Sequence, residues 1–265
     1  MIVQGKSIVV TGGGNGVGRE LVLQLLEKGA TVYAVDINEE ALKETVSLSG
    51  NSKRIFTYVV DISNKETVFN FAETVMKEHG KVDGIINNAG IIQPFIDLNE
   101  LEMDRIDRVM NINFYGTLYM VKAFLPHLLK RPEAHIVNVS SMGGFLPVPG
   151  QSIYGASKAA VKLLTEALSS ELAGTNVGVS VVIPGGIATD IKKNSGLNTK
   201  GSNDSKKAGK QTTPKTAAYL IIEAMEKKRL RSYVGKDCKI MNALYKLSPK
   251  SAMNMINKVM SAGEH

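Results

Sequence analysis

Residues 7–18 read Ser7-Ile8-Val9-Val10-Thr11-Gly12-Gly13-Gly14-Asn15-Gly16-Val17-Gly18, and this stretch decides the fold. It opens with an apolar, β-branched run typical of a buried strand, and a helical pattern over 17–28 follows its glycines. Glycines between a strand and a helix let the main chain turn tightly and approach a phosphate, and the helix N-terminus offers free N–H groups. We therefore expect a dinucleotide pyrophosphate to bind at this turn, against Gly12, Asn15, Gly16, Val17 and Gly18.

Beyond the glycine turn, short apolar runs alternate with helical patterns. We expect strands at 31–35, 56–60, 82–86, 135–139 and 179–183, with an edge strand at 231–234, and helices at 39–47, 65–79, around 104–130 and at 155–173. Repeated βαβ units form parallel sheets with right-handed crossovers. The predicted fold class is α/β: one Rossmann-like, doubly wound, mostly parallel sheet of about seven strands with helices on both faces, formed by residues 1–265 as a single domain.

The bulk composition excludes several classes of protein. Hydrophobic residues make up 43% and charged residues 22%, as in soluble globular proteins. One cysteine and four histidines argue against a disulfide scaffold and against a metal site, so no metal is expected. The sequence shows neither a signal peptide nor an apolar run long enough to cross a bilayer, which favours the cytoplasm.

The net charge of +7 comes largely from 192–215 and 227–258. These segments lack the interleaved aromatic residues on which bases stack, so no nucleic-acid partner is expected. A solvated basic surface is the favoured interpretation of the charge. Contact with an anionic substrate or a membrane surface is the less favoured one.

Asp36 ends the second expected strand, next to Ile37. A carboxylate there accepts hydrogen bonds from both adenosine ribose hydroxyls and repels a 2′-phosphate, which favours NAD over NADP. Arg19 lies just after the glycine turn, close enough in sequence to reach such a phosphate. NADP therefore stays the less favoured alternative.

Tyr154 and Lys158 stand four residues apart near the start of an expected helix, which places both side chains on one face. A free tyrosine titrates near 10, too high for a good base at neutral pH. We expect the Lys158 ammonium to lower the Tyr154 pKa toward the working pH, where proton transfer is most efficient.

Together these motifs resemble the short-chain dehydrogenase/reductase family, in its compact single-domain branch. The resemblance covers about residues 5–190. It rests on Thr11-Gly-x-x-x-Gly16-x-Gly18, Asp61, Asn87-Asn88-Ala89-Gly90, Asn113, Ser141, Tyr154-x-x-x-Lys158 and Pro184-Gly185.

The resemblance implies roles for these positions. Tyr154 passes the proton, Ser141 orients the substrate oxygen, Lys158 binds the nicotinamide ribose, and Asn113 bends its helix and holds a water that links Lys158 to solvent. Ser140 is left as a packing residue. The implied cofactor contacts are Asp61 and Ile62 at the adenine, Asn88, Ala89 and Gly90 on the adenosine side, and Pro184, Gly185, Ile187 and Thr189 at the nicotinamide, together with Tyr154 and Lys158.

The implied activity is hydride transfer between NAD(H) and the carbonyl or alcohol carbon of a small or hydrophobic substrate. Two alternatives stay open: an NADPH-dependent 3-oxoacyl thioester reductase and a non-catalytic dinucleotide sensor. Substrate choice is expected from 93–96, 143–151 and a mobile loop at about 190–215. Helices at about 236–262 are expected to cover the pocket or to join an interface, and the family's habits imply a homodimer or homotetramer.

Overall fold

The computed structural model describes residues 1–189, 191–197 and 211–261. Its centre is a seven-stranded sheet in the order β3-β2-β1-β4-β5-β6-β7, and every described strand pairing is parallel. The strands are β1 (Ser7–Thr11), β2 (Thr31–Asp36), β3 (Ile55–Val59), β4 (Gly84–Asn87), β5 (Ala134–Val139), β6 (Val177–Pro184) and β7 (Arg231–Val234). The predicted fold class is confirmed, including the edge strand at 231–234.

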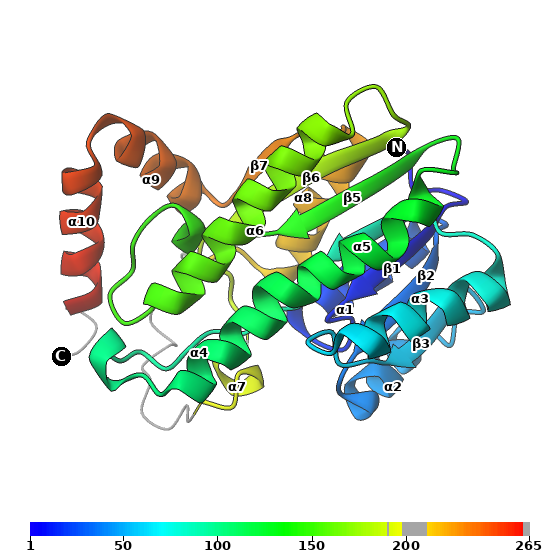
Figure 1. The fold of residues 1–265 in the computed structure, drawn as a ribbon, viewed down its shortest axis with the longest axis horizontal. Helices are drawn as coiled ribbons and strands as arrows, with labels where there is room; N and C mark the ends of the chain where they lie inside the picture. Colours follow the sequence, from blue (N-terminus) through cyan, green and yellow to red (C-terminus); the bar gives the residue numbers. More distant parts are fainter. Residues whose placement is uncertain (190, 198–210, 262–265) are drawn as a thin grey trace.

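Helices cover both faces of the sheet (Figure 1). They are α1 (Gly16–Glu27), α2 (Glu39–Leu48), α3 (Lys65–His79), α4 (Met103–Met110), α5 (Thr117–Leu128), α6 (Ser152–Glu171), α7 (Ile191–Asn194), α8 (Pro214–Glu226), α9 (Lys236–Leu247) and α10 (Pro249–Ser261). Figure 1 shows α3, α5 and α6 in front of the sheet and α8 behind it.

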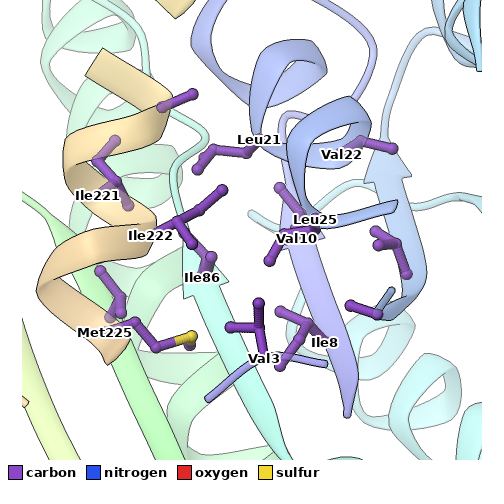
Figure 2. Close-up of a cluster of buried hydrophobic side chains, with 14 of the residues drawn as sticks. Val3, Ile8, Val10, Leu21, Val22, Leu25, Ile86, Ile221, Ile222 and Met225 are labelled. Atoms are coloured by element: carbon purple, nitrogen blue, oxygen red, sulfur yellow. The ribbon is translucent and has the colours of Figure 1, made fainter. Parts of the chain in front are cut away.

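Two apolar clusters hold these layers together. On one face, α1 and α8 pack on β1 and β4 through Leu21, Leu25, Ile221 and Ile222 (Figure 2). On the other face, buried side chains of α3, α5 and α6 pack on the same sheet. Because both faces are covered, the central strands consist of continuous apolar runs rather than alternating ones.

The helical stretch expected around 104–130 has an interruption. Between α4 and α5, the six-residue segment η2 (Asn111–Gly116) is π-helical. A π-helical turn inserts extra main chain into a helix and often occurs at functional sites. This π-helical segment contains Asn113, where the resemblance implies a bend.

The sheet also fixes where a ligand can bind. The connections run in opposite directions from the adjacent strands β1 and β4, since β2 lies on one side and β5 on the other. In such sheets, ligands bind outside the carboxyl ends of the strands at this switch point. The glycine turn follows β1, and residues 88–90 follow β4, so both motifs lie at this edge.

The C-terminal part adds a small helical unit at one end of the molecule (Figure 1). The buried Met241 of α9 and Ala252 of α10 pack with Leu146. Of the expected mobile loop, 191–194 form α7 and α8 begins at Pro214, while residue 190 and residues 198–210 lie outside the described residues. Within the described ranges, no helix has the length and apolar character that crossing a bilayer requires.

Candidate active site

The glycine turn packs tightly between β1, β2 and α1. The Gly13 N–H donates to the Val35 carbonyl over 2.9 Å, and the Gly14 N–H donates to Asp36 Oδ2 over 3.0 Å. A Cβ on Gly18 would collide with the Gly12 carbonyl oxygen, so only glycine lets α1 approach this closely. Asn15, the N-cap of α1, makes no side-chain cap. The first N–H groups of the helix thus stay available to an anion.

A cavity of about 330 Å³ opens beside this turn. Its wall brings together most of the residues predicted to hold the cofactor on the adenosine side: Gly12, Asn15, Gly16, Val17, Asp36, Ile37, Asp61, Ile62, Asn88, Ala89 and Gly90. Arg108 of α4 also lines it. The sequence analysis missed Arg108, because its position on a helix does not show which face meets the cleft.

Asp36 and Arg19 differ in what they offer to a ligand. Asp36 lines the cavity, and although it accepts hydrogen bonds from Gly14 and Asn38, a carboxylate has further acceptor positions. The Arg19 guanidinium instead donates to the Gly14 carbonyl over 2.9 Å and pairs with Glu44 at 2.5 Å. Arg19, the cation that could have offset the negative charge of Asp36, is therefore paired with a carboxylate of α2.

The segment after β4 is fixed by Thr11. Its hydroxyl oxygen accepts hydrogen bonds from the Asn88 and Ala89 N–H groups, each over 3.1 Å, and Asn88 Nδ2 donates to the Thr11 carbonyl. These contacts place residues 88–90 against the glycine turn. The structural role of Thr11 was not foreseen, because its partners lie 77 and 78 positions away in the sequence.

A second cavity of about 640 Å³ continues from the first. Six residues line both: Gly16, Val17, Asn88, Gly90, Thr189 and Ile191. Its wall also contains Ser141, Tyr154, Lys158, Pro184, Gly185 and Ile187 from the prediction, together with the apolar side chains of Ile92, Phe95, Met142 and Val148. The predicted reacting groups and the predicted nicotinamide contacts thus face one space, next to the dinucleotide cleft.

Tyr154 and Ser141 form the polar centre of this wall. Burial raises the pKa of the Tyr154 phenol, and a hydrogen bond with the Ser141 side chain opposes that rise. Ser141 Oγ also accepts a hydrogen bond from the Gly143 N–H over 3.1 Å. The Gly143 N–H occupies one acceptor position of Ser141 Oγ, and the hydroxyl keeps its proton as a donor.

Lys158 does not act on Tyr154 as expected. Within the described part of the chain, burial and Ser141 are the two influences on the Tyr154 pKa, so the predicted lowering by Lys158 is not found. The Lys158 ammonium donates to the Val139 carbonyl over 3.0 Å. Burial also lowers the pKa of Lys158 itself to about 8.

Asn113 lies behind Lys158 rather than in the cavity wall. Its amide exchanges two 2.9 Å hydrogen bonds with the main chain of Ile91 and donates to Ser157 Oγ over 3.0 Å. A Cβ on Gly90 would lie 3.0 Å from Lys158 Nζ and 3.1 Å from Asn113 Oδ1, so the glycine leaves room for both groups. Asn113 thereby ties the segment after β4 to α6.

The two serines before η3 (Met142–Gly144) have different environments. Ser140 is buried and its hydroxyl donates to the Lys158 carbonyl over 2.7 Å, although the residue also lines the second cavity. Ser141 faces Tyr154. The sequence alone did not show which of the two serines has the catalytic role, and that assignment came from the family resemblance.

Residues from later in the chain hold the loop after β6 in place. The Gly186 N–H donates to Asp237 Oδ2 over 2.8 Å, and residues 186–188 pair with Thr212 through main-chain hydrogen bonds. Asp237 belongs to α9, well beyond the quoted motifs. Sequence reasoning missed it because nothing in its local pattern distinguishes it from a first-turn acidic residue of an ordinary helix.

Within the segment 93–96, from which substrate choice is expected, Gln93 does not line the second cavity. Gln93 is 0% exposed, and its side-chain oxygen accepts hydrogen bonds from the Ile153 and Tyr154 N–H groups of α6. The neighbouring Phe95 and Gln151 do line the second cavity. Of the predicted cofactor and reacting residues, Gly18 and Asn113 lie outside both walls and act through packing and hydrogen bonds.

Among the described residues, no group of three or more His, Cys, Asp or Glu side chains could hold a metal ion.

Comparison with known proteins identifies the family of this chain. The family model described as short chain dehydrogenase matches residues 6–200. SadH of Mycobacterium tuberculosis, which carries the name of an oxidoreductase, is 33% identical over 264 residues, covering 96% of this chain and 94% of that protein.

Two solved structures share the fold over nearly their whole length. A short-chain dehydrogenase/reductase from Burkholderia phymatum in complex with NAD has a TM-score of 0.82 at 27% identity, covering 93% of this chain and 96% of that one. A short-chain dehydrogenase from Burkholderia cenocepacia in complex with NADP has a TM-score of 0.80 at 28% identity, covering 97% and 99%.

Proposed function

This chain belongs to the short-chain dehydrogenase family and is an oxidoreductase of that type, and on that premise we propose that it interconverts an alcohol and a carbonyl with NAD(H), using Tyr154 as the proton donor and acceptor. The observation that carries the proposal is the shared wall of the two cavities. Tyr154 and Ser141 face a space that is continuous with the cleft lined by the glycine turn and Asp36.

The residues fit a nicotinamide dinucleotide. The tight turn at Gly18 and the free N–H groups of α1 suit the pyrophosphate, Asp36 suits the ribose hydroxyls, and Ile37 and Ile62 give the adenine an apolar wall. When bound, the cofactor supplies or accepts the hydride. The protein contributes position and electrostatics.

Each reacting side chain has a distinct task. Tyr154 donates its phenolic proton to the developing alkoxide in the reductive direction and takes it back in the oxidative direction. Ser141 donates a hydrogen bond to the same substrate oxygen. The Lys158 ammonium, held close to Asn113 and Gly90, offers donors to a ribose hydroxyl.

NAD is the proposed cofactor because of the charges in the cleft. Asp36 would repel a 2′-phosphate, and Arg19 is paired with Glu44 on α2. The same pair of observations argues against the NADPH-dependent thioester reductase. A dinucleotide sensor would have no need for Ser141, Tyr154 and Lys158 to line one cavity.

A cofactor-oxidation assay separates these functions. The purified protein is given NADH or NADPH with acetophenone, cyclohexanone, a long-chain methyl ketone or an acetoacetyl thioester, and loss of reduced-cofactor absorbance is followed. We expect NADH to bind more tightly than NADPH and to be oxidised with an apolar ketone. Turnover confined to NADPH and the thioester would favour the reductase alternative, and NADH binding without oxidation by any ketone would favour the sensor.

A further inference from the structure

The catalytic helix α6 is capped by a residue from another part of the chain. Tyr154 is the third residue of this helix, and the N-cap residue Gln151 makes no side-chain cap. The first N–H groups of any helix lack partners within it, and a capping side chain usually serves the second or third of them. Here Gln93 Oε1 accepts from the Ile153 N–H over 2.8 Å and from the Tyr154 N–H over 3.0 Å.

The main chain at Gln93 is itself held in place by hydrogen bonds from other segments. Its main-chain carbonyl accepts a 2.9 Å hydrogen bond from Gln151 Nε2, which also donates to the Gly150 carbonyl. The residue before it, Ile92, donates its N–H to Ser195 Oγ over 3.0 Å. The main chain at 91–93 is thus fixed on several sides, and it can serve as an anchor for the start of α6.

The orientation of the Gln93 amide follows from its partners. Two main-chain N–H groups point at Oε1, so a rotated amide would direct its own N–H groups at donors. The Nε2 group of Gln93 is buried without a hydrogen-bond partner among the described residues. The contact with Tyr154 therefore depends on the oxygen and not on the nitrogen.

We propose that Gln93 is a positioning residue for catalysis: its side-chain oxygen fixes the main chain of Tyr154 and so places the phenol against Ser141. The inference rests on the proposed function, because it assigns a role through Tyr154. Gln93 lies outside the described cavity wall around Tyr154, so it acts without touching the substrate. A displacement of about 1 Å at a reacting group lowers turnover by on the order of a hundredfold.

The test compares two replacements of Gln93 with a matched control. Gln93→Met has a similar volume and lacks the oxygen. Gln93→Glu keeps an acceptor oxygen, replaces the nitrogen that has no partner and adds a carboxylate charge, which the N-terminus of α6 stabilises. Gln24→Met is the control, since Gln24 is another buried glutamine, donates to the main chain of Lys215 on α8 and lines neither cavity. Each variant is assayed for kcat, KM and NADH affinity, using the ketone that gives turnover in the panel above.

A second readout needs no substrate. Tyrosine labelled with carbon-13 at Cζ reports the pKa of each phenol by NMR, and the Tyr154 signal is assigned by its loss in Tyr154→Phe. Because the hydrogen bond with Ser141 lowers the Tyr154 pKa, Gln93→Met should raise that pKa by weakening the bond. The pH profile of kcat should shift in the same direction.

We expect Gln93→Met to lower kcat by about 10- to 100-fold with KM and NADH affinity changed by less than about threefold. Gln93→Glu should keep kcat within about threefold of wild type, and Gln24→Met should leave kcat unchanged. If Gln93→Met does not fold, Gln93→Asn, which withdraws the oxygen by one methylene group, carries the same expectation.

A wild-type kcat and Tyr154 signal in a folded Gln93→Met or Gln93→Asn variant would overturn the proposal. So would an equal loss of kcat in Gln93→Glu and Gln93→Met, because the oxygen would then not be the relevant group. Full activity of Tyr154→Phe would instead overturn the proposed function itself, so the two failures are distinguishable.

Discussion

Replacing Lys158 with methionine should change how the stability of the protein depends on pH. Burial lowers the pKa of this lysine from 10.5 to about 8, so the unfolded chain binds its proton more tightly than the folded protein does. At 1.36 kcal/mol per pKa unit, holding the buried ammonium costs the folded state about 3 kcal/mol below about pH 8. The cost falls as the pH rises through the folded pKa, because the lysine then loses its proton.

The assay is urea unfolding of the cofactor-free wild type and of Lys158→Met at a series of pH values. Between about pH 7 and about pH 9.5, the free energy of unfolding of the wild type should rise by about 2 kcal/mol relative to the variant. Lys158→Met also loses the hydrogen bond to the Val139 carbonyl, which lowers its free energy of unfolding by the same amount at every pH. Comparing how the free energy of unfolding changes with pH in the two proteins cancels this constant effect. A difference between the two proteins that stays flat over this range would refute the lowered lysine pKa.

Three further predictions follow from individual contacts. Asp36→Asn keeps an acceptor for the Gly14 N–H but removes the charge, so the ratio of NADPH affinity to NADH affinity should rise by about tenfold. Cofactor fluorescence measures both affinities, and an unchanged ratio would show that Asp36 does not select the cofactor. Gly18→Ala forces a Cβ against the Gly12 carbonyl and should abolish NADH binding, and an alanine variant with wild-type NADH affinity would contradict the packing of this turn. His135 is buried in β5 with its pKa lowered to about 3, so the folded protein should lose stability as the pH falls below the pKa of this histidine in the unfolded chain. Relative to His135→Gln, the wild type should lose about 2 kcal/mol of unfolding free energy between about pH 6.5 and about pH 4.5. Parallel pH curves for the two proteins would exclude this.

The sheet could be predicted from the sequence because its signals are local. The run Ile8-Val9-Val10 followed by glycines, and the regular alternation of strands and helices after it, determine a doubly wound parallel sheet without knowledge of any tertiary contact. The same holds for Tyr154 and Lys158, whose spacing places them on one helix face. Element ends were less accurate, since α6 begins at Ser152 and not at residue 155.

What the sequence could not provide are contacts between distant segments. Gln93 precedes Tyr154 by 61 positions, and its apparent place in a variable loop suggested a substrate contact instead of a helix cap. Arg19 seemed free to reach a phosphate until the structure paired it with Glu44. The pKa of Tyr154 likewise depends on burial and on the hydrogen bond with Ser141, which spacing along a helix does not specify.

The central claim is that the Tyr154 phenol transfers a proton beside a bound dinucleotide. It is tested most directly by the rate of NADH oxidation by Tyr154→Phe, with NADH affinity measured on the same sample. We predict a rate lower by on the order of a hundred- to ten-thousandfold with NADH affinity close to that of the wild type. A wild-type rate in this variant would contradict the assignment of Tyr154 and, with it, the mechanism.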